Sequence, residues 1–243
     1  MAGKDYFLIT SLPTPGPLGS KPPISLAELV GHALYNRSAR ELIQAIFLGD
    51  DLLQRQSFLA GELKDVSPTV LTAAQVRNQE PLPAWLEVRE QQPGGPSPID
   101  SLWAAYYRHA IRVAGRLGSD FLTGWVIYEV AFRNALVVAR AKALGLDAEM
   151  YLVEPSLAPG DLDFDSVLAE WSAAPNPLAG LRVLDAARWA WLTEHDAYYT
   201  FGDDELAAYA AKLMLLHRWH RLSEHASASQ AHDAEQPSER TLP

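Results

Sequence analysis

SDFLTGWVIYEVAFRNALVVARAKALG, residues 119–145, is the stretch from which the fold is predicted. Its large apolar side chains recur every three or four positions, which places them on one face of a helix. They belong to Phe121, Leu122, Trp125, Tyr128, Phe132, Leu136 and Ala143. Ser119 is a suitable N-cap, and Gly145 is a suitable stop because glycine adopts the left-handed conformation that ends many helices. We therefore predict one long helix that ends at Leu144.

The flanking sequence predicts further helices on both sides. Ser25 with Glu28, and Ser38 with Glu41, match the capping-box pattern at a helix start. The other expected helices cover residues 99–117, 178–200 and 203–225, with short ones over 69–78 and 84–91 and around Leu168 and Trp171. Leu and Ala are frequent in these segments, so helix propensity agrees with the periodicity. The predicted fold class is mainly α, built from helical bundles.

Proline, glycine and polarity divide the chain into expected parts. Residues 6–10, YFLIT, are rich in β-formers and predict a short extended N-terminal segment. Residues 92–98, QPGGPSP, predict a linker. We therefore expect an N-terminal part over 1–91 and a C-terminal helical core over 99–225. The polar residues 226–243 predict a disordered tail.

Composition excludes several classes of protein and site. The formal net charge of −10 and the pI of about 5.1 disfavour non-specific binding to nucleic acid or anionic lipid. The chain has no cysteine, which excludes disulfides, thiolate metal sites and cysteine nucleophiles. The apolar run at 6–10 is too short for a signal peptide, and we expect no membrane span. We therefore expect a cytoplasmic protein that reaches the inner membrane only through partner subunits.

Two groups of side chains match metal sites only in part. The acidic loop at 161–165 begins like a calcium loop, but Ser166 stands where the turn needs glycine and Ser172 where the loop needs glutamate. His217 and His220 are three positions apart, whereas metal-binding helices place two histidines four apart. We therefore expect a solvated acidic loop before a helix and a mixed helical surface. The sequence predicts no catalytic residue, no metal and no cofactor, and it lacks the phosphate-loop and nucleophile-elbow motifs.

Glu129 and Arg133 lie four positions apart on the long helix, with Asn134 beside them and Arg140 further along. A local pair of this kind adds only about 0.5 kcal/mol. On so apolar a helix, partly buried charges need further hydrogen bonds. We therefore expect a network that bridges neighbouring helices rather than a catalytic acid.

Seven Trp and nine Tyr are the most distinctive side chains of the sequence. Most of those in the C-terminal part should pack in the core, because aromatic rings bury a large area. A minority left exposed would be anchors for a protein partner.

Two segments carry a resemblance to a known family. The first contains Trp125, Tyr128, Glu129, Arg133, Asn134 and Arg140. The second contains Asp185, Arg188, Trp189 and Trp191 and leads to Tyr209, Lys212, Arg218 and Trp219. With the opening residues 6–13, these segments resemble an uncharacterised family encoded beside bacterial V-type ATPase genes. The resemblance spans most of the chain outside residues 60–100 and the tail.

That family is similar to a shortened form of the V-type ATPase C subunit, called d in eukaryotes. This stalk component is a funnel of helical bundles that sits on the membrane rotor ring and receives the central shaft. The resemblance implies a non-catalytic central-stalk component whose partners are the shaft and ring subunits. Apart from Tyr128 and Asp185, the motif residues named above are the candidates for structural or interaction roles.

Two alternatives remain open at this point. One is a helical adaptor or assembly factor that binds the same complex transiently. The other, with less support from motifs, is a helical-bundle metalloenzyme. Fixed stoichiometry with the complex would distinguish a permanent component from an assembly factor, and bound metal would favour the enzyme.

Overall fold

The computed structural model describes residues 6–86, 97–158, 160 and 162–234, with side chains described up to Ser223. Within these ranges the chain forms nine α-helices, three short 3-10 helices and no strand, so the prediction of a mainly helical fold is confirmed. The α-helices are α1 (Tyr6–Ser11), α2 (Leu26–His32), α3 (Arg37–Leu59), α4 (Ala73–Val76), α5 (Pro98–Leu117), α6 (Asp120–Leu144), α7 (Asp165–Ser172), α8 (Pro177–Glu194) and α9 (Asp203–Ala234). The 3-10 helices are η1 (Ala84–Leu86), η2 (Ala148–Tyr151) and η3 (Pro155–Leu157).

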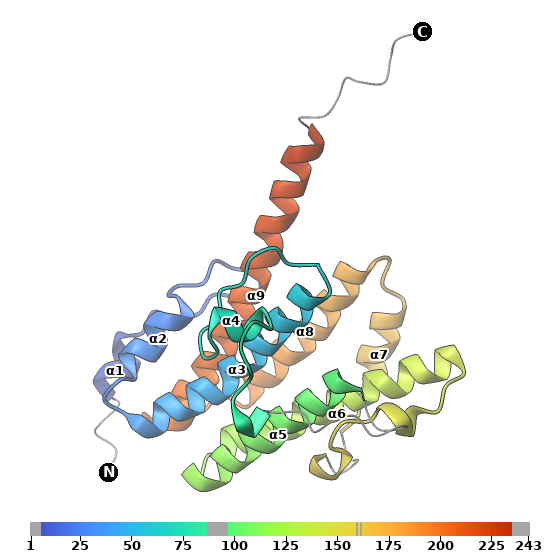
Figure 1. Cartoon of the computed structure of the whole chain (residues 1–243). Helices are drawn as coiled ribbons and strands as arrows, with labels where there is room; N and C mark the ends of the chain where they lie inside the picture. The colour runs from blue at the N-terminus through green and yellow to red at the C-terminus, as the bar shows by residue number, and fades with distance from the viewer. Residues whose placement is uncertain (1–5, 87–96, 159, 161, 235–243) are drawn as a thin grey trace.

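Helices α3 and α9 lie side by side at the centre of the bundle (Figure 1). Helix α5 packs on α3, α6 packs on α5 and α9, and α8 packs on α9 and on the short α7. Helix α2 covers another part of α9. Buried side chains of the expected N-terminal part, such as Phe47, therefore share one hydrophobic core with those of the expected C-terminal core, such as Phe132. Of the expected linker, residues 92–96 lie outside the described residues.

Helix α6 begins and ends as the sequence predicts. The Ser119 hydroxyl accepts a hydrogen bond from the Leu122 N–H at 3.0 Å, and Gly145 has the left-handed φ of 68°. The helix is long and apolar enough to cross a membrane by length and composition alone, with a mean hydropathy of 1.3, contrary to our expectation of no such stretch. Core helices of soluble proteins pass the same test, and Phe132 and Leu122 of α6 are fully buried in the bundle.

The expected extended segment at residues 6–10 is wrong, because these residues form helix α1. A strand needs a neighbour to pair with, and the described residues contain none. The side chains of Thr10 and Ser11 instead donate hydrogen bonds to the carbonyls of Tyr6 and Leu8, both at 2.7 Å. Leu8 and Ile9 pack against the core, so tertiary contact outweighs the local β propensity.

Other helix limits differ from the prediction. Helix α3 is capped by Asn36, whose side chain accepts from the Ala39 N–H at 3.1 Å, and Ser38 lies inside the helix. The helix expected over 69–78 contracts to α4, which Thr72 caps. Of the helix expected over 84–91, η1 is described and residues 87–91 lie outside the described part of the chain.

Helix α9 continues to Ala234, although residues 226–234 were expected to lie in a disordered tail. This segment contains neither glycine nor proline and is rich in alanine, so nothing in it ends the helix. It extends beyond the rest of the bundle (Figure 1). Residues 235–243 of the expected tail lie outside the described residues.

Candidate functional site

A cavity of about 320 Å³ lies among α3, α5, α6, α8 and α9. Four arginines and one glutamate line it, together with aromatic and apolar side chains. The charged residues are Glu129, Arg133 and Arg140 of α6, Arg188 of α8 and Arg218 of α9. All five are among the candidates predicted from the sequence, which places them up to 89 positions apart.

The wall formed by α3 and α5 is made of rings packed against a glycine. A side chain at Gly49 would place its Cβ 2.9 Å from the Tyr106 hydroxyl, so glycine allows the two helices to approach closely. Trp103, Tyr106 and Tyr107 contact one another with ring centroids 5.1–5.8 Å apart. Burial raises the pKa of both tyrosines well above the ordinary value, so each phenol stays protonated.

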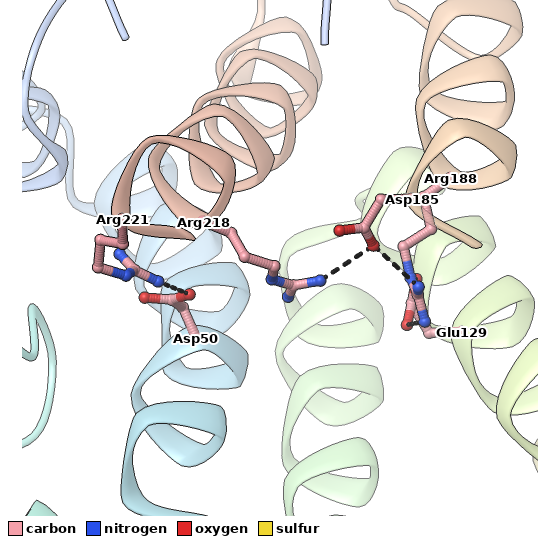
Figure 2. A network of polar contacts seen from close by, with 6 residues as sticks. All are labelled: Asp50, Glu129, Asp185, Arg188, Arg218 and Arg221. Carbon is pink, nitrogen blue, oxygen red and sulfur yellow. Dashed lines mark hydrogen bonds and ion pairs between the residues drawn. The ribbon is translucent and has the colours of Figure 1, made fainter. Parts of the chain in front are cut away.

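A chain of ion pairs ties three helices together, namely α6, α8 and α9 (Figure 2). Arg188 Nε donates to Glu129 Oε1 at 2.7 Å, and Arg188 Nη1 donates to Asp185 Oδ1 at 3.0 Å. Arg218 Nη1 donates to the same Asp185 oxygen at 3.1 Å. Burial alone would lower the pKa of Arg188, but the two carboxylates outweigh it and raise that pKa. The prediction that Glu129 bonds to a neighbouring helix is therefore confirmed.

Glu129 and Arg133 do not form the local pair that their spacing offers. Glu129 binds Arg188 instead, while Arg133 donates to Asp100 of α5 at 2.9 Å. The Arg133 guanidinium also lies 5.3 Å from the centre of the Trp103 ring. Both side chains therefore connect α6 to a neighbouring helix rather than reinforcing α6 itself.

Two consecutive aspartates on α3 form a second buried polar cluster. Asp50 accepts from Arg221 of α9 at 2.6 Å (Figure 2) and from Gln54 at 2.9 Å. Asp51 accepts three backbone N–H bonds, from Thr69, Val70 and Leu71, at 2.7–2.8 Å. Burial nevertheless raises the pKa of Asp51 to about 6. This carboxylate fixes the 69–71 loop to the central helix.

Tyr209 and Lys212 lie away from the cavity, near α1 and the loop between α8 and α9. The Tyr209 hydroxyl donates to the Pro13 carbonyl at 2.9 Å. Lys212 is buried, pairs with Asp196 and lies 4.9 Å from the centre of the Tyr198 ring. A small pocket of about 140 Å³ adjoins these side chains.

Tyr198 lines this pocket, and with four other aromatic residues it forms what we term the aromatic end. The rings of Tyr6, Phe7, Tyr198 and Tyr199 are exposed, and that of Phe201 is partly buried. The Tyr6 ring contacts Phe201 at 4.9 Å and Phe7 at 5.7 Å. Phe7 and Tyr199 are 80% and 84% exposed. Tyr199 and Phe201 both have positive φ, 64° and 51°, which is uncommon for residues other than glycine.

The remaining predicted residues have structural contacts. Asn134 holds Val153 by two hydrogen bonds of 2.9 Å, one in each direction between side chain and backbone. Arg140 lies over the Trp171 ring at 5.2 Å, and Trp125 is buried against Trp191 at 5.5 Å. Trp189 packs partly buried against the core, and the buried Trp219 indole N–H has no hydrogen-bond partner among the described residues.

Sequence reasoning missed the acidic partners of the arginines. Asp185 stands inside the second motif, but was not treated as a candidate although it holds two arginines. Asp100 partners Arg133, and Trp103 lies under it. One signal was available, since Asp50 and Asp51 interrupt the apolar stretch of residues 45–53, where charges need partners.

The described residues do not contain a group of three or more His, Asp or Glu side chains that could hold a metal ion. His217 Nε2 instead lies 2.8 Å from the Ile24 carbonyl oxygen. In the acidic loop, Asp163 accepts from the Asp165 N–H at 2.9 Å, directly where α7 begins. The prediction of an acidic loop leading into a helix is confirmed for these two residues, and Asp161 lies outside the described part.

The chemistry of the cavity favours binding over proton transfer. Arginine stays protonated at any physiological pH, and the raised pKa values keep Tyr106 and Tyr107 protonated. Glu129 is held by two hydrogen bonds from Arg188, of 2.7 and 3.3 Å.

Comparisons with protein-family models, with curated proteins and with solved structures find no match for this chain.

Proposed function

We propose that the chain is a non-catalytic helical component of the central stalk of a bacterial V-type ATPase, where it joins the rotor shaft to the membrane ring. The exposed rings of the aromatic end are the observation that supports a role in protein–protein interaction. The choice of complex is supported by the resemblance of the two motifs around Glu129 and Arg188 to the family encoded beside V-type ATPase genes.

The aromatic end has the chemistry of a protein-binding surface. Aromatic rings supply large contact area and dominate the energetics of many interfaces. Positive φ at Tyr199 and Phe201 costs on the order of 1–3 kcal/mol each, and such strain is concentrated at functional surfaces. Buried Lys212 and Asp196 support the loop from below, so the exposed rings are presented on a fixed base.

A torque-transmitting component also has to be rigid, and the ion-pair network suits that requirement. Arg188, Asp185 and Arg218 link α8 and α9, and Glu129 extends the link to α6. Several charges that share partners in this way resist sliding between helices more than isolated surface pairs do. The formal net charge of −10 suits a basic partner surface, such as a positively charged shaft end.

The proposal is tested by affinity purification of the tagged chain from its native membranes, with identification of the co-purifying subunits. We expect V-type catalytic, shaft and ring subunits in fixed stoichiometry. The double variant Phe7→Ser, Tyr199→Ser should lose these subunits while keeping its melting temperature. Tyr35→Ser is the matched control, because Tyr35 is 98% exposed but lies outside the aromatic end.

Three other results of this purification would each contradict part of the proposal. Recovery in substoichiometric amounts, and only with incompletely assembled complexes, would assign the chain as an assembly factor. Recovery without any V-type subunit would overturn the choice of complex. Equal recovery of partners with the double variant and with Tyr35→Ser would overturn the choice of surface.

A further inference from the structure

We propose that the arginine-lined cavity is a binding site for a small organic anion, with a phosphate or carboxylate group held by the arginines and a flat apolar part held by the aromatic wall. This site lies apart from the aromatic end, and the proposal does not depend on the stalk role.

The charge in and around the cavity is unbalanced. Arg133, Arg140, Arg188 and Arg218 line it, and Glu129 is the only acidic residue among the described lining residues. Asp100 and Asp185 partner three of the arginines from outside the lining. Even with all three carboxylates counted, one positive charge remains. That charge is the exposed guanidinium of Arg140, so the cavity entrance favours an anion.

Two guanidinium donors on residues that line the cavity also lack an acceptor. Nε of Arg133 and Nε of Arg218 are buried, and neither has a hydrogen-bond partner in the described part of the chain. Oδ2 of Asp185 is also buried without a described partner, so the unpaired donors of this network outnumber its unpaired acceptors. A buried donor left unpaired costs about 1–3 kcal/mol, and such groups are rare in folded proteins. An oxyanion would supply the acceptor and would form charge-assisted bonds. The cost is then offset only when the ligand is bound.

The rest of the cavity suits the non-ionic part of such a ligand. Trp103, Tyr106, Tyr107 and Trp125 line it with aromatic rings. Its volume of about 320 Å³ lies at the lower end of the range for small-molecule sites, which begins at about 300 Å³. Arg140 is exposed, also borders a neighbouring surface pocket beside Trp171, and makes no ion pair with a described residue. It is therefore positioned to meet an anion at the cavity entrance.

The test measures binding of three compounds to the full-length chain by isothermal titration calorimetry, at an ionic strength of about 0.15 M. Phenyl phosphate carries both features, inorganic phosphate carries only the charge, and phenol carries only the ring. We expect phenyl phosphate to bind most tightly, with one site per chain. Its binding should also change the tryptophan fluorescence, because Trp103 and Trp125 line the cavity.

Variants then locate the site. Arg133→Gln and Arg140→Gln should each weaken phenyl phosphate binding by about tenfold or more, the effect of losing one charge-assisted hydrogen bond. Arg140 is exposed, so its replacement leaves folding intact and keeps the test valid if Arg133→Gln is destabilised. Arg37→Gln is the matched control, because the Arg37 side chain is 85% exposed and remote from the cavity lining.

Equal affinity of the control and of both cavity variants would show binding elsewhere on the surface and would overturn the site. Absence of binding by all three compounds would mean that the cavity holds only water, and would overturn the proposal. Tighter binding of phenol than of phenyl phosphate would overturn the role assigned to the arginines.

Discussion

The two buried polar clusters, one around Asp51 and one around the cavity, are built in opposite ways. Asp51 of α3 is paired at both oxygens by backbone N–H groups of the loop that it holds. In the cavity, by contrast, Arg133 and Arg218 each keep a buried donor without a described partner. A cluster whose donors and acceptors are all paired stabilises the fold. A cluster beside a cavity that keeps unpaired donors can still form hydrogen bonds to a ligand.

The comparison also separates stability from binding. Where the chain itself pairs a buried charge, removal of one partner should destabilise the fold strongly. Donors that await a ligand should contribute little to the stability of the empty protein, since functional sites are seldom optimised for stability. Substitutions of the paired carboxylates and substitutions of the arginines with unpaired donors should therefore differ in which property they change.

The largest effect is expected for Asp185→Ala, which removes the acceptor that two arginines share. Asp185 is fully buried and accepts from both Arg188 and Arg218, so its removal leaves buried guanidinium charge with fewer partners. We expect the free energy of unfolding to fall by about 3–5 kcal/mol. Urea denaturation measures this, with Glu154→Ala as control because its partner Arg108 is exposed. Equal losses in the two variants would contradict the structural role of Asp185.

The next largest effect is expected for Asp51→Asn. The amide has one oxygen in place of two, and its NH₂ group would face a backbone N–H. We expect a loss of about 1–3 kcal/mol in the free energy of unfolding at about pH 7, where the Asp51 carboxylate is ionised. Urea denaturation of both proteins provides the measurement. A loss below about 0.5 kcal/mol would show that the 69–71 loop is held by other contacts.

The same variant tests the raised pKa of Asp51. Because burial holds this pKa at about 6 against the ordinary 3.8, the folded state binds the proton more tightly than the unfolded state. The stabilising contribution of protonated Asp51 is therefore complete below about pH 4 and is lost as the pH rises through about 6. The difference in stability between wild type and Asp51→Asn should narrow over that window. A difference that widens would contradict the direction of the pKa shift.

A smaller effect on stability is expected for Arg133→Gln in the cavity. Its ion pair with Asp100 is partly exposed, and its Nε has no described partner, so little stabilisation is lost. We expect the free energy of unfolding to change by less than about 1 kcal/mol, although anion binding falls. Thermal melting with and without phenyl phosphate measures both properties. A loss of stability as large as that of Asp185→Ala would show that Arg133 stabilises the fold and would contradict a role limited to anion binding.

The smallest effect is expected on removal of residues 226–243. The part of α9 that this deletion removes extends beyond the bundle (Figure 1), so the core helices keep their contacts. We expect a change of less than about 0.5 kcal/mol in the free energy of unfolding, measured by urea denaturation. A clear fall in melting temperature would show that the end of α9 supports the bundle.

Much of the helical layout could be predicted, because its signals are local. The apolar period of residues 119–144 and the caps Ser119 and Gly145 lie within the helix that they define. The acidic stretch before α7 was also interpreted correctly at Asp163 and Asp165. Predictions failed where tertiary contact outweighed propensity, as in α1, or where a helix met no stop signal, as at the end of α9.

The sequence by itself determined that the chain is mainly helical, that most of the large rings of α6 face a core, and that Glu129 and Arg133 need partners. The tertiary structure decided which partners they receive, because Asp100 and Arg188 come from other helices, 33 and 59 positions away. It also decided that four arginines line one cavity and that two of their donors have no partner among the described residues. A local pattern specifies a face of a helix, but only packing brings faces from distant helices into contact.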